Sequence, residues 1–82
     1  MTPEELEDIY GPLYRFSDHK IGDVITFSDP ATDEQYRAAI LWVQAPGQRI
    51  EGGQHHTMKY IMNERDPDTG QLFAVEPSDV LR

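Results

Sequence analysis

Residues 36–44 read YRAAILWVQ, and this stretch decides the fold expected for the chain. Aliphatic, β-branched and aromatic residues concentrate between Ile40 and Val43, which is typical of a β-strand. The apolar residues follow one another instead of alternating with polar ones, which indicates a strand that is partly covered on both faces. With 82 residues in total, the chain is expected to form one small domain, residues 1–82, around this strand.

Four other stretches predict further strands on either side of it. Residues 21–27 (IGDVITF) are expected to form a strand that is entered through a Gly-Asp turn. In residues 56–63 (HTMKYIMN), successive side chains fall alternately into two sets, as they do on the two faces of a strand. Residues 72–75 (LFAV) form a short fourth strand, and Pro77–Asp79 forms a tight turn before a last short strand, Val80–Leu81. The sequence therefore predicts a mainly β protein.

Two of the connections share their chemistry. Residues 29–33 read DPATD and residues 66–70 read DPDTG. Asp at the first turn position can accept a bond from the backbone two residues on, and Pro fixes φ at the next position. Gly70 can supply the positive φ that follows a type I turn, and Asp33 holds the equivalent place. Both connections are therefore expected to be hairpin loops.

The N-terminal segment predicts a helix over residues 3–10. Thr2 is a suitable N-cap, Pro3 fits the first helical position, and Glu5 completes a capping box. Gly11-Pro12 ends the helix. Its apolar residues at helical spacing, expected to dock on the strands, are Leu6, Ile9 and Tyr10.

The order of these elements in residues 20–82 resembles the SH3-like small barrels, a group that includes Tudor and KOW-type domains. The residues that carry the resemblance are Ile21-Gly22-Asp23, Ala39 to Val43, Tyr60-Ile61-Met62 and Val75 to Leu81. It implies a five-stranded SH3-like barrel preceded by a short N-terminal helix and lead-in over residues 1–19. Because one such superfold hosts many functions, the resemblance implies no particular activity.

The connection at residues 45–54 (APGQRIEGGQ) is longer than a hairpin needs. Loops of this kind are often functional, and this one carries an isolated cation, Arg49, on an acidic protein. His55 and His56 follow it, and in a strand adjacent side chains point to opposite faces. With His19 as the only other histidine and no cysteine, the chain predicts no metal site and no cofactor. His55 is instead expected to be a partner contact beside the loop.

Seven aromatic residues lie within the expected barrel or just before it: Tyr14, Phe16, Phe27, Tyr36, Trp42, Tyr60 and Phe73. A core this small needs most of them. If some are exposed, Tyr36, Trp42 and Tyr60 are the best candidates, because they lie on neighbouring strands beside the long loop. An exposed Trp with acidic neighbours suits a cation or a basic peptide.

Composition and charge argue against several functions. The net charge of −8, with seven basic residues among fifteen acidic ones, disfavours direct nucleic-acid binding, which needs phosphate neutralisation. No apolar run is long enough for a transmembrane helix, and the acidic N-terminus does not resemble a secretory signal, so a cytoplasmic location is expected. Ser17-Asp18-His19 has the residue types of a triad, but adjacency in sequence is not triad geometry, and an enzyme is not expected.

The leading functional hypothesis is a small acidic protein-interaction module, an accessory or regulatory factor. Its expected contact surface is the 45–54 loop with Tyr36, Trp42 and Tyr60. A second hypothesis is an acidic nucleic-acid mimic that inhibits a DNA- or RNA-binding protein, which predicts that carboxylates cluster on one face. A third is a reader of modified lysine or arginine, which requires three aromatic side chains exposed around one pocket.

Overall fold

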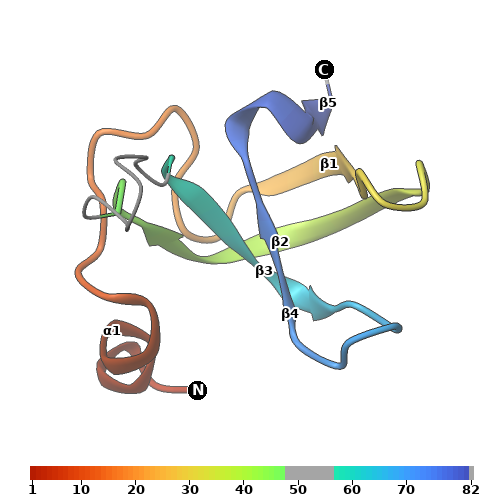
Figure 1. Ribbon diagram of the computed structural model, residues 1–82. Helices are drawn as coiled ribbons and strands as arrows, with labels where there is room; N and C mark the ends of the chain where they lie inside the picture. The colour runs from red at the N-terminus through yellow and green to blue at the C-terminus, as the bar shows by residue number, and fades with distance from the viewer. Residues whose placement is uncertain (48–56, 82) are drawn as a thin grey trace, which may run out of the picture.

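The computed structural model describes residues 1–47 and 57–81, in which a short N-terminal helix precedes five antiparallel strands that form one sheet (Figure 1). The strand order is β4-β3-β2-β1-β5. The elements are α1 (Pro3–Tyr10), β1 (Val24–Ser28), β2 (Gln35–Gln44), β3 (Lys59–Arg65), β4 (Leu72–Val75), the 3₁₀ helix η1 (Pro77–Asp79) and β5 (Val80–Leu81). The prediction of a mainly β protein with an N-terminal helix is confirmed. No helix in these described ranges is long and apolar enough to cross a membrane.

The sheet is not closed. β4 and β5 stand at its two edges, and β5 pairs with β1 alone. Because β5 has two residues, its ladder covers only the Thr26 and Phe27 positions of β1. The closed barrel implied by the sequence resemblance is therefore not confirmed.

β2 joins the two halves of the sheet. Its first half, Gln35–Ala39, pairs with β1, and its second half, from Ile40, pairs with β3. The register with β3 shifts between Ile40 and Trp42. Such an irregularity bends a strand and increases its twist, so the sheet curves and gains an inner and an outer face (Figure 1).

The inner face encloses the larger apolar core. Phe27 and Phe73 meet there edge to face, with ring centroids 5.2 Å apart. The buried residues of this inner core are Ile25, Phe27, Ala38, Ile40, Val43, Tyr60, Met62, Phe73 and Val75.

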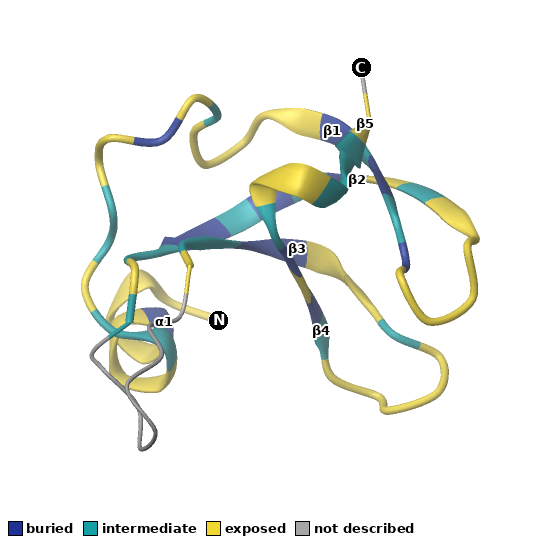
Figure 2. Ribbon diagram, turned by 45° about the horizontal axis from the view of Figure 1, so that its top comes forward, coloured by how far each residue is buried: buried dark blue, intermediate teal, exposed yellow. Residues whose placement is uncertain are grey.

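The outer face of β2 and β3 is covered by α1. Leu6 packs there with Trp42 and Ile61, and these three side chains form the outer core. The Trp42 indole Nε1–H donates to the Gly11 carbonyl at 3.1 Å, and the Gln44 amide donates to the Tyr10 carbonyl at 3.1 Å. The prediction that the central strand is covered on both faces is confirmed, as its buried and half-buried residues show in Figure 2.

The helix begins and ends where the sequence predicts. The Glu5 backbone N–H donates to the Thr2 hydroxyl oxygen at 3.3 Å, and Gly11 follows the last turn with φ of 87°. The expected apolar stripe is only partly docked, because Leu6 is buried while Ile9 is 59% exposed. At about 100° per residue, Ile9 and Tyr10 fall on opposite sides of Leu6. The helix rolls toward Tyr10, which turns Ile9 into solvent.

The two Asp-Pro connections adopt the same structure. In the first, the Asp33 N–H donates to the Asp29 carbonyl at 2.8 Å, and in the second the Gly70 N–H donates to the Asp66 carbonyl at 2.7 Å. Asp33 and Gly70 have φ of 62° and 73°. The first Asp of each loop also accepts a bond from the backbone N–H two residues on. The prediction of two equivalent hairpin loops, including the positive φ of Asp33, is confirmed.

The first strand begins later than predicted. Gly22 has φ of 92°, and the segment before it forms a turn in which the Lys20 N–H donates to the Asp23 carboxylate at 2.8 Å. The left-handed Gly22 ends the extended pairing, so β1 starts at Val24 instead of Ile21. Ile21 therefore lies outside the ladder and is 46% exposed.

Candidate functional site

Two of the three aromatic residues favoured as contact residues are buried. Trp42 is 5% exposed in the outer core and Tyr60 is 2% exposed in the inner core. Both residues therefore belong to the core, and neither ring has a face available to a partner in this conformation. Arg49 and His55 lie outside the described residues, as does the rest of the 48–56 stretch.

Tyr36 is half-buried and belongs to the hairpin end of the sheet. Its ring lies 4.8 Å from Phe73, and its hydroxyl donates to the Glu34 carboxylate at 2.7 Å. That hydrogen bond, with desolvation and the charges of Glu34, Asp29 and Asp66, raises the pKa of Tyr36 to about 12. The Tyr36 side chain therefore lies near carboxylates of the two Asp-Pro hairpin loops.

The carboxylates expected on one face divide into two groups. Four lie on α1, and five lie on the two Asp-Pro hairpin loops. Figures 1 and 2 place the helix and the two hairpin loops at opposite ends of the molecule. The members are Glu4, Glu5, Glu7 and Asp8 on the helix, and Asp29, Asp33, Glu34, Asp66 and Asp68 on the loops.

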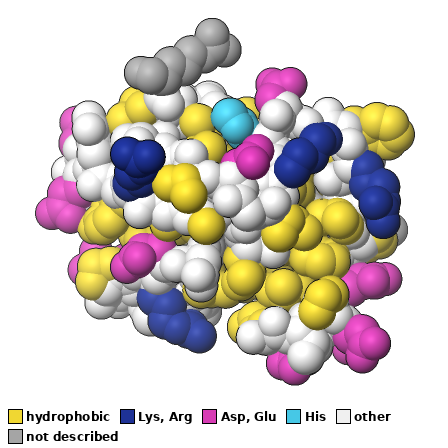
Figure 3. Space-filling view, turned by 180° about the vertical axis from the view of Figure 1, so that it is seen from behind, with side chains coloured by type: hydrophobic (Ala, Val, Ile, Leu, Met, Phe, Trp, Pro, Cys, Tyr) yellow, Lys and Arg dark blue, Asp and Glu magenta, His cyan; other side chains and the backbone are white. Residues whose placement is uncertain are grey.

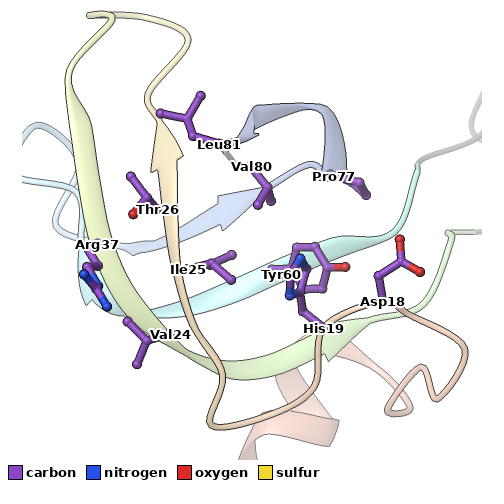
Figure 4. A pocket seen from close by; sticks show the side chains of 10 residues that line it. All are labelled: Asp18, His19, Val24, Ile25, Thr26, Arg37, Tyr60, Pro77, Val80 and Leu81. Atoms are coloured by element: carbon purple, nitrogen blue, oxygen red, sulfur yellow. The ribbon is translucent and has the colours of Figure 1, made fainter.

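A groove of about 670 Å³ opens beside β1 and β5 (Figure 4). This volume falls within the roughly 300–1,000 Å³ typical of ligand sites. The apolar residues at its centre are Ile25, Val80 and Tyr60, which come from β1, β5 and β3. Val24 and Leu81, which also line it, are 55% and 37% exposed.

The two ends of this groove carry opposite charges. Arg37 lies at one end, beside Val24 and Thr26, and Asp18 and His19 lie at the other (Figure 4). The His19 imidazole packs edge to face on the Tyr60 ring, with centroids 5.6 Å apart. The arrangement provides an apolar middle between a cationic and an anionic end.

The segment that carries Asp18 and His19, residues 14–21, is called the lead-in loop here. The Tyr14 N–H donates to the Val43 carbonyl at 2.9 Å and ties its start to β2. The Lys20 ammonium donates to the Arg15 and Ser17 carbonyls at 2.9 and 2.7 Å. The buried Ser17 hydroxyl donates to the His19 backbone carbonyl and not to an imidazole, so Ser17-Asp18-His19 does not assemble a triad.

The lead-in loop displays apolar side chains to solvent. Phe16 is 85% exposed, and its ring packs edge to face with the Tyr14 ring, with centroids 5.7 Å apart. Beside it, a hollow of about 300 Å³ lies between the lead-in loop and β2. Its lining residues are Leu13, Tyr14, Arg15, Lys20, Ile21 and Val43. Phe16 together with the exposed Arg15, Lys20 and Ile21 is called the lead-in surface.

Figure 3 shows the molecule from behind; hydrophobic side chains lie across the face in view, with basic and acidic ones between and around them. Sequence reasoning placed Phe16 among seven aromatic residues of which the core needs most, and it considered Asp18 and His19 only as members of a triad or, for His19, as a metal ligand. Phe16 does stand in a segment without helical or alternating periodicity, next to Arg15, and that signal was available.

Within residues 1–47 and 57–81, no group of three His, Asp or Glu side chains is placed to hold a metal ion. The candidate site consists of the exposed apolar residues of the lead-in loop and the groove with charged ends. Comparisons with protein-family models, with curated proteins and with solved structures found no match to this chain.

Proposed function

We propose that this protein is a small protein-interaction module that contacts its partner through the lead-in surface and the adjoining groove. The observation that carries the proposal is Phe16, which is 85% exposed on an ordered loop. Burying a phenylalanine side chain is worth about 1.5–3 kcal/mol, so leaving one in water forgoes that stabilisation. A partner that covers Phe16 recovers it.

The lead-in loop is held in place by hydrogen bonds, which favours a functional exposure of Phe16 over a chance exposure. Hydrogen bonds hold it at three points: the Tyr14 N–H bond to β2, the two Lys20 ammonium bonds, and the Lys20–Asp23 turn. A loop tied at these points presents Phe16 in a fixed place. Preorganised aromatic side chains lose little conformational entropy on binding, which is why they often dominate interface energetics.

The contact surface proposed here differs from the one favoured by the sequence. Trp42 and Tyr60 stabilise the two cores, and Arg49 and His55 lie outside the described residues. Phe16, Ile21 and the groove residues take their place as candidate contacts. The accessory or regulatory role remains part of the proposal, as does a binding function in place of a catalytic one.

We also propose that the sheet is a small SH3-like barrel opened between β4 and β5. The strand order, the irregularity in β2 and the 3₁₀ helix η1 immediately before β5 support it. β2 is shared between two sheet halves, as expected where one long strand turns a barrel corner. This fold assignment carries no function with it.

The two other hypotheses have less support. An acidic nucleic-acid mimic needs its carboxylates on one face, and the nine that define it lie at two opposite ends. A reader of modified lysine or arginine needs exposed rings, and Trp42 and Tyr60 are buried.

Affinity capture with paired variants tests the proposal. Tagged wild-type protein, Phe16→Ser and Ile9→Ser are incubated with extract from the native host, and bound proteins are quantified by mass spectrometry. We expect a protein captured by wild type to fall about tenfold or more with Phe16→Ser and to be retained with Ile9→Ser. Ile9 is the matched control because it is an exposed apolar side chain on α1. Equal capture by all three would reject the lead-in surface as the contact.

A further inference from the structure

The groove beside β1 and β5 has one part that lies on the inner side of the sheet. Ile25 and Tyr60 belong to the inner core, and Val80 packs against it. Arg37 pairs with Thr26, so it lies on the opposite face of β1 from Ile25 and takes no part here. This part of the groove is called the inner recess, and its residues are Asp18, His19, Ile25, Tyr60, Pro77 and Val80.

Tyr60 presents its hydroxyl to the inner recess. The side chain is 2% exposed, and within residues 1–47 and 57–81 its hydroxyl has no hydrogen-bond partner. In the same part of the chain no fully enclosed side-chain N or O atom lacks a partner, so the hydroxyl is open to the recess. Figure 4 shows its oxygen at the end of the ring nearest Asp18. Because buried tyrosine hydroxyls are normally hydrogen-bonded, this one is available to a ligand.

Asp18 lies at the same end of the recess, on a loop segment that is fixed on both sides of it. The Ser17 hydroxyl donates to the His19 carbonyl and so closes a turn around Asp18. Lys20, two residues on, donates its ammonium to two carbonyls of the lead-in loop at 2.9 and 2.7 Å and not to the Asp18 carboxylate. The exposed Asp18 side chain is therefore held beside the Tyr60 hydroxyl.

The chemistry of the inner recess favours a cation with an apolar stem. The Asp18 carboxylate and the Tyr60 oxygen both accept hydrogen bonds, and the side chains beside them, Ile25, Pro77 and Val80, are apolar. Lysine and arginine combine N–H donors with a methylene stem that packs along apolar surface. A neutral donor would satisfy the hydroxyl but would leave the carboxylate without a counter-charge. The net charge of −8 also attracts a cationic segment to the protein.

We infer that the inner recess receives a basic side chain, of lysine or arginine, from the partner protein. Its charged head lies between the Asp18 carboxylate and the Tyr60 hydroxyl, and its stem lies along Val80 and Pro77. Asp18 and Phe16 stand two residues apart on the lead-in loop, so one partner reaches both. This inference rests on the proposed protein-binding function.

Three capped pentapeptides of the form Ala-Ala-X-Ala-Ala test it, with lysine, arginine or norleucine as X. Norleucine has an apolar stem like that of lysine but no ammonium, so it measures the apolar contribution alone. Each peptide is titrated into ¹⁵N-labelled protein and followed by amide chemical shifts. We expect a basic peptide to bind about fivefold more tightly than the norleucine peptide, with the largest shifts at residues 18, 19 and 60. The tighter of the two basic peptides identifies the preferred side chain.

Asp18→Asn and Asp8→Asn are the matched variants. Each removes one exposed carboxylate, so both change the net charge equally and both are expected to keep the fold. Asp18→Asn is expected to abolish the preference for the basic peptide, and Asp8→Asn, on α1, to keep it. Tyr60→Phe removes only the hydroxyl, and it is expected to weaken the basic peptide about threefold and to leave the norleucine peptide unchanged.

Three results would overturn the inference. They are equal binding of the basic and norleucine peptides, equal weakening by Asp8→Asn and Asp18→Asn, and shifts that map to Phe16 and Ile21 and not to Tyr60. If Phe16→Ser still loses the captured partner, any of these results rejects only the inner recess and leaves the protein-binding function in place. If the peptides behave as expected and capture survives Phe16→Ser, the inner recess stands and the lead-in surface is rejected.

Discussion

Two surfaces of this protein carry apolar side chains, and they differ in whether another part of the chain covers them. The outer face of β2 and β3 is covered by the chain's own helix, through Leu6 on Trp42 and Ile61. Within residues 1–47 and 57–81 no element covers the lead-in surface in this way, and Phe16 and Ile21 are exposed to solvent. α1 covers the first surface, and the hydrogen-bonded lead-in loop leaves the second exposed. The difference separates apolar residues that stabilise the fold from apolar residues available to a partner.

The largest expected effect is at the centre of the covered surface. Trp42→Ala removes a nearly fully buried indole and its 3.1 Å bond to the Gly11 carbonyl. We expect a loss of about 3–5 kcal/mol in the free energy of unfolding, typical of large-to-small changes in a core. Urea unfolding followed by circular dichroism measures it. A loss below about 1 kcal/mol would show that α1 does not seal this face.

The helix side of the same contact is expected to give the next largest effect. Leu6→Ala should cost about 2–4 kcal/mol, because Leu6 is 3% exposed between Trp42 and Ile61. Ile9→Ala on the same helix is the control, and its cost should stay within about 0.5 kcal/mol. Equal costs for the two variants, measured in the same urea titrations, would contradict the docking of α1 through Leu6.

The uncovered surface predicts the reverse behaviour. Phe16→Ser should change the free energy of unfolding by less than about 0.5 kcal/mol, because the ring makes little contact with the rest of the protein. It should at the same time reduce partner capture, so stability and binding separate at this residue. A stability loss like that of Leu6→Ala would place Phe16 in the core and remove the contrast between the two surfaces.

The smallest effect is expected at Tyr36. This residue is half-buried, so it is intermediate between the covered and the uncovered surface. Its neutral phenol is favoured in the folded protein by the hydrogen bond to Glu34, which raises the pKa of Tyr36 to about 12 against about 10 in an unfolded chain. A pKa raised on folding means that the stabilising contribution is complete below about pH 10 and is lost as the pH rises to about 12. The difference between the ultraviolet titrations of wild type and Tyr36→Phe should show a midpoint near pH 12. A midpoint near 10 would contradict the bond.

Much of the fold follows from local patterns in the sequence. The capping residue Thr2, the breaker Gly11 and the two Asp-Pro loops act over a few residues, and each produced the expected structure. The consecutive apolar residues of β2 also predicted cover on both faces, and α1 and the inner core supply it. Information of this kind lies within one turn or one strand.

The candidate site was less accessible to sequence reasoning, because it depends on contacts between distant segments. Trp42 is buried by a helix that lies about thirty residues earlier in the chain, and no local pattern reveals that docking. The groove joins Asp18, Arg37, Tyr60 and Val80, which come together only once the sheet has formed. Phe16 was one of seven aromatic residues of which a small core was expected to need most, and its solvent exposure in the structure makes it a candidate contact.

The most direct test of the contrast between the two surfaces is photo-crosslinking in cells that naturally make the protein. A photoreactive phenylalanine analogue is placed at position 16 and, in a second variant, at position 9, which is exposed and apolar but lies on α1. The account predicts a discrete crosslinked protein from position 16 and none from position 9. No product from position 16, or the same products from both positions, would contradict the claim that the lead-in surface is where this protein meets its partner.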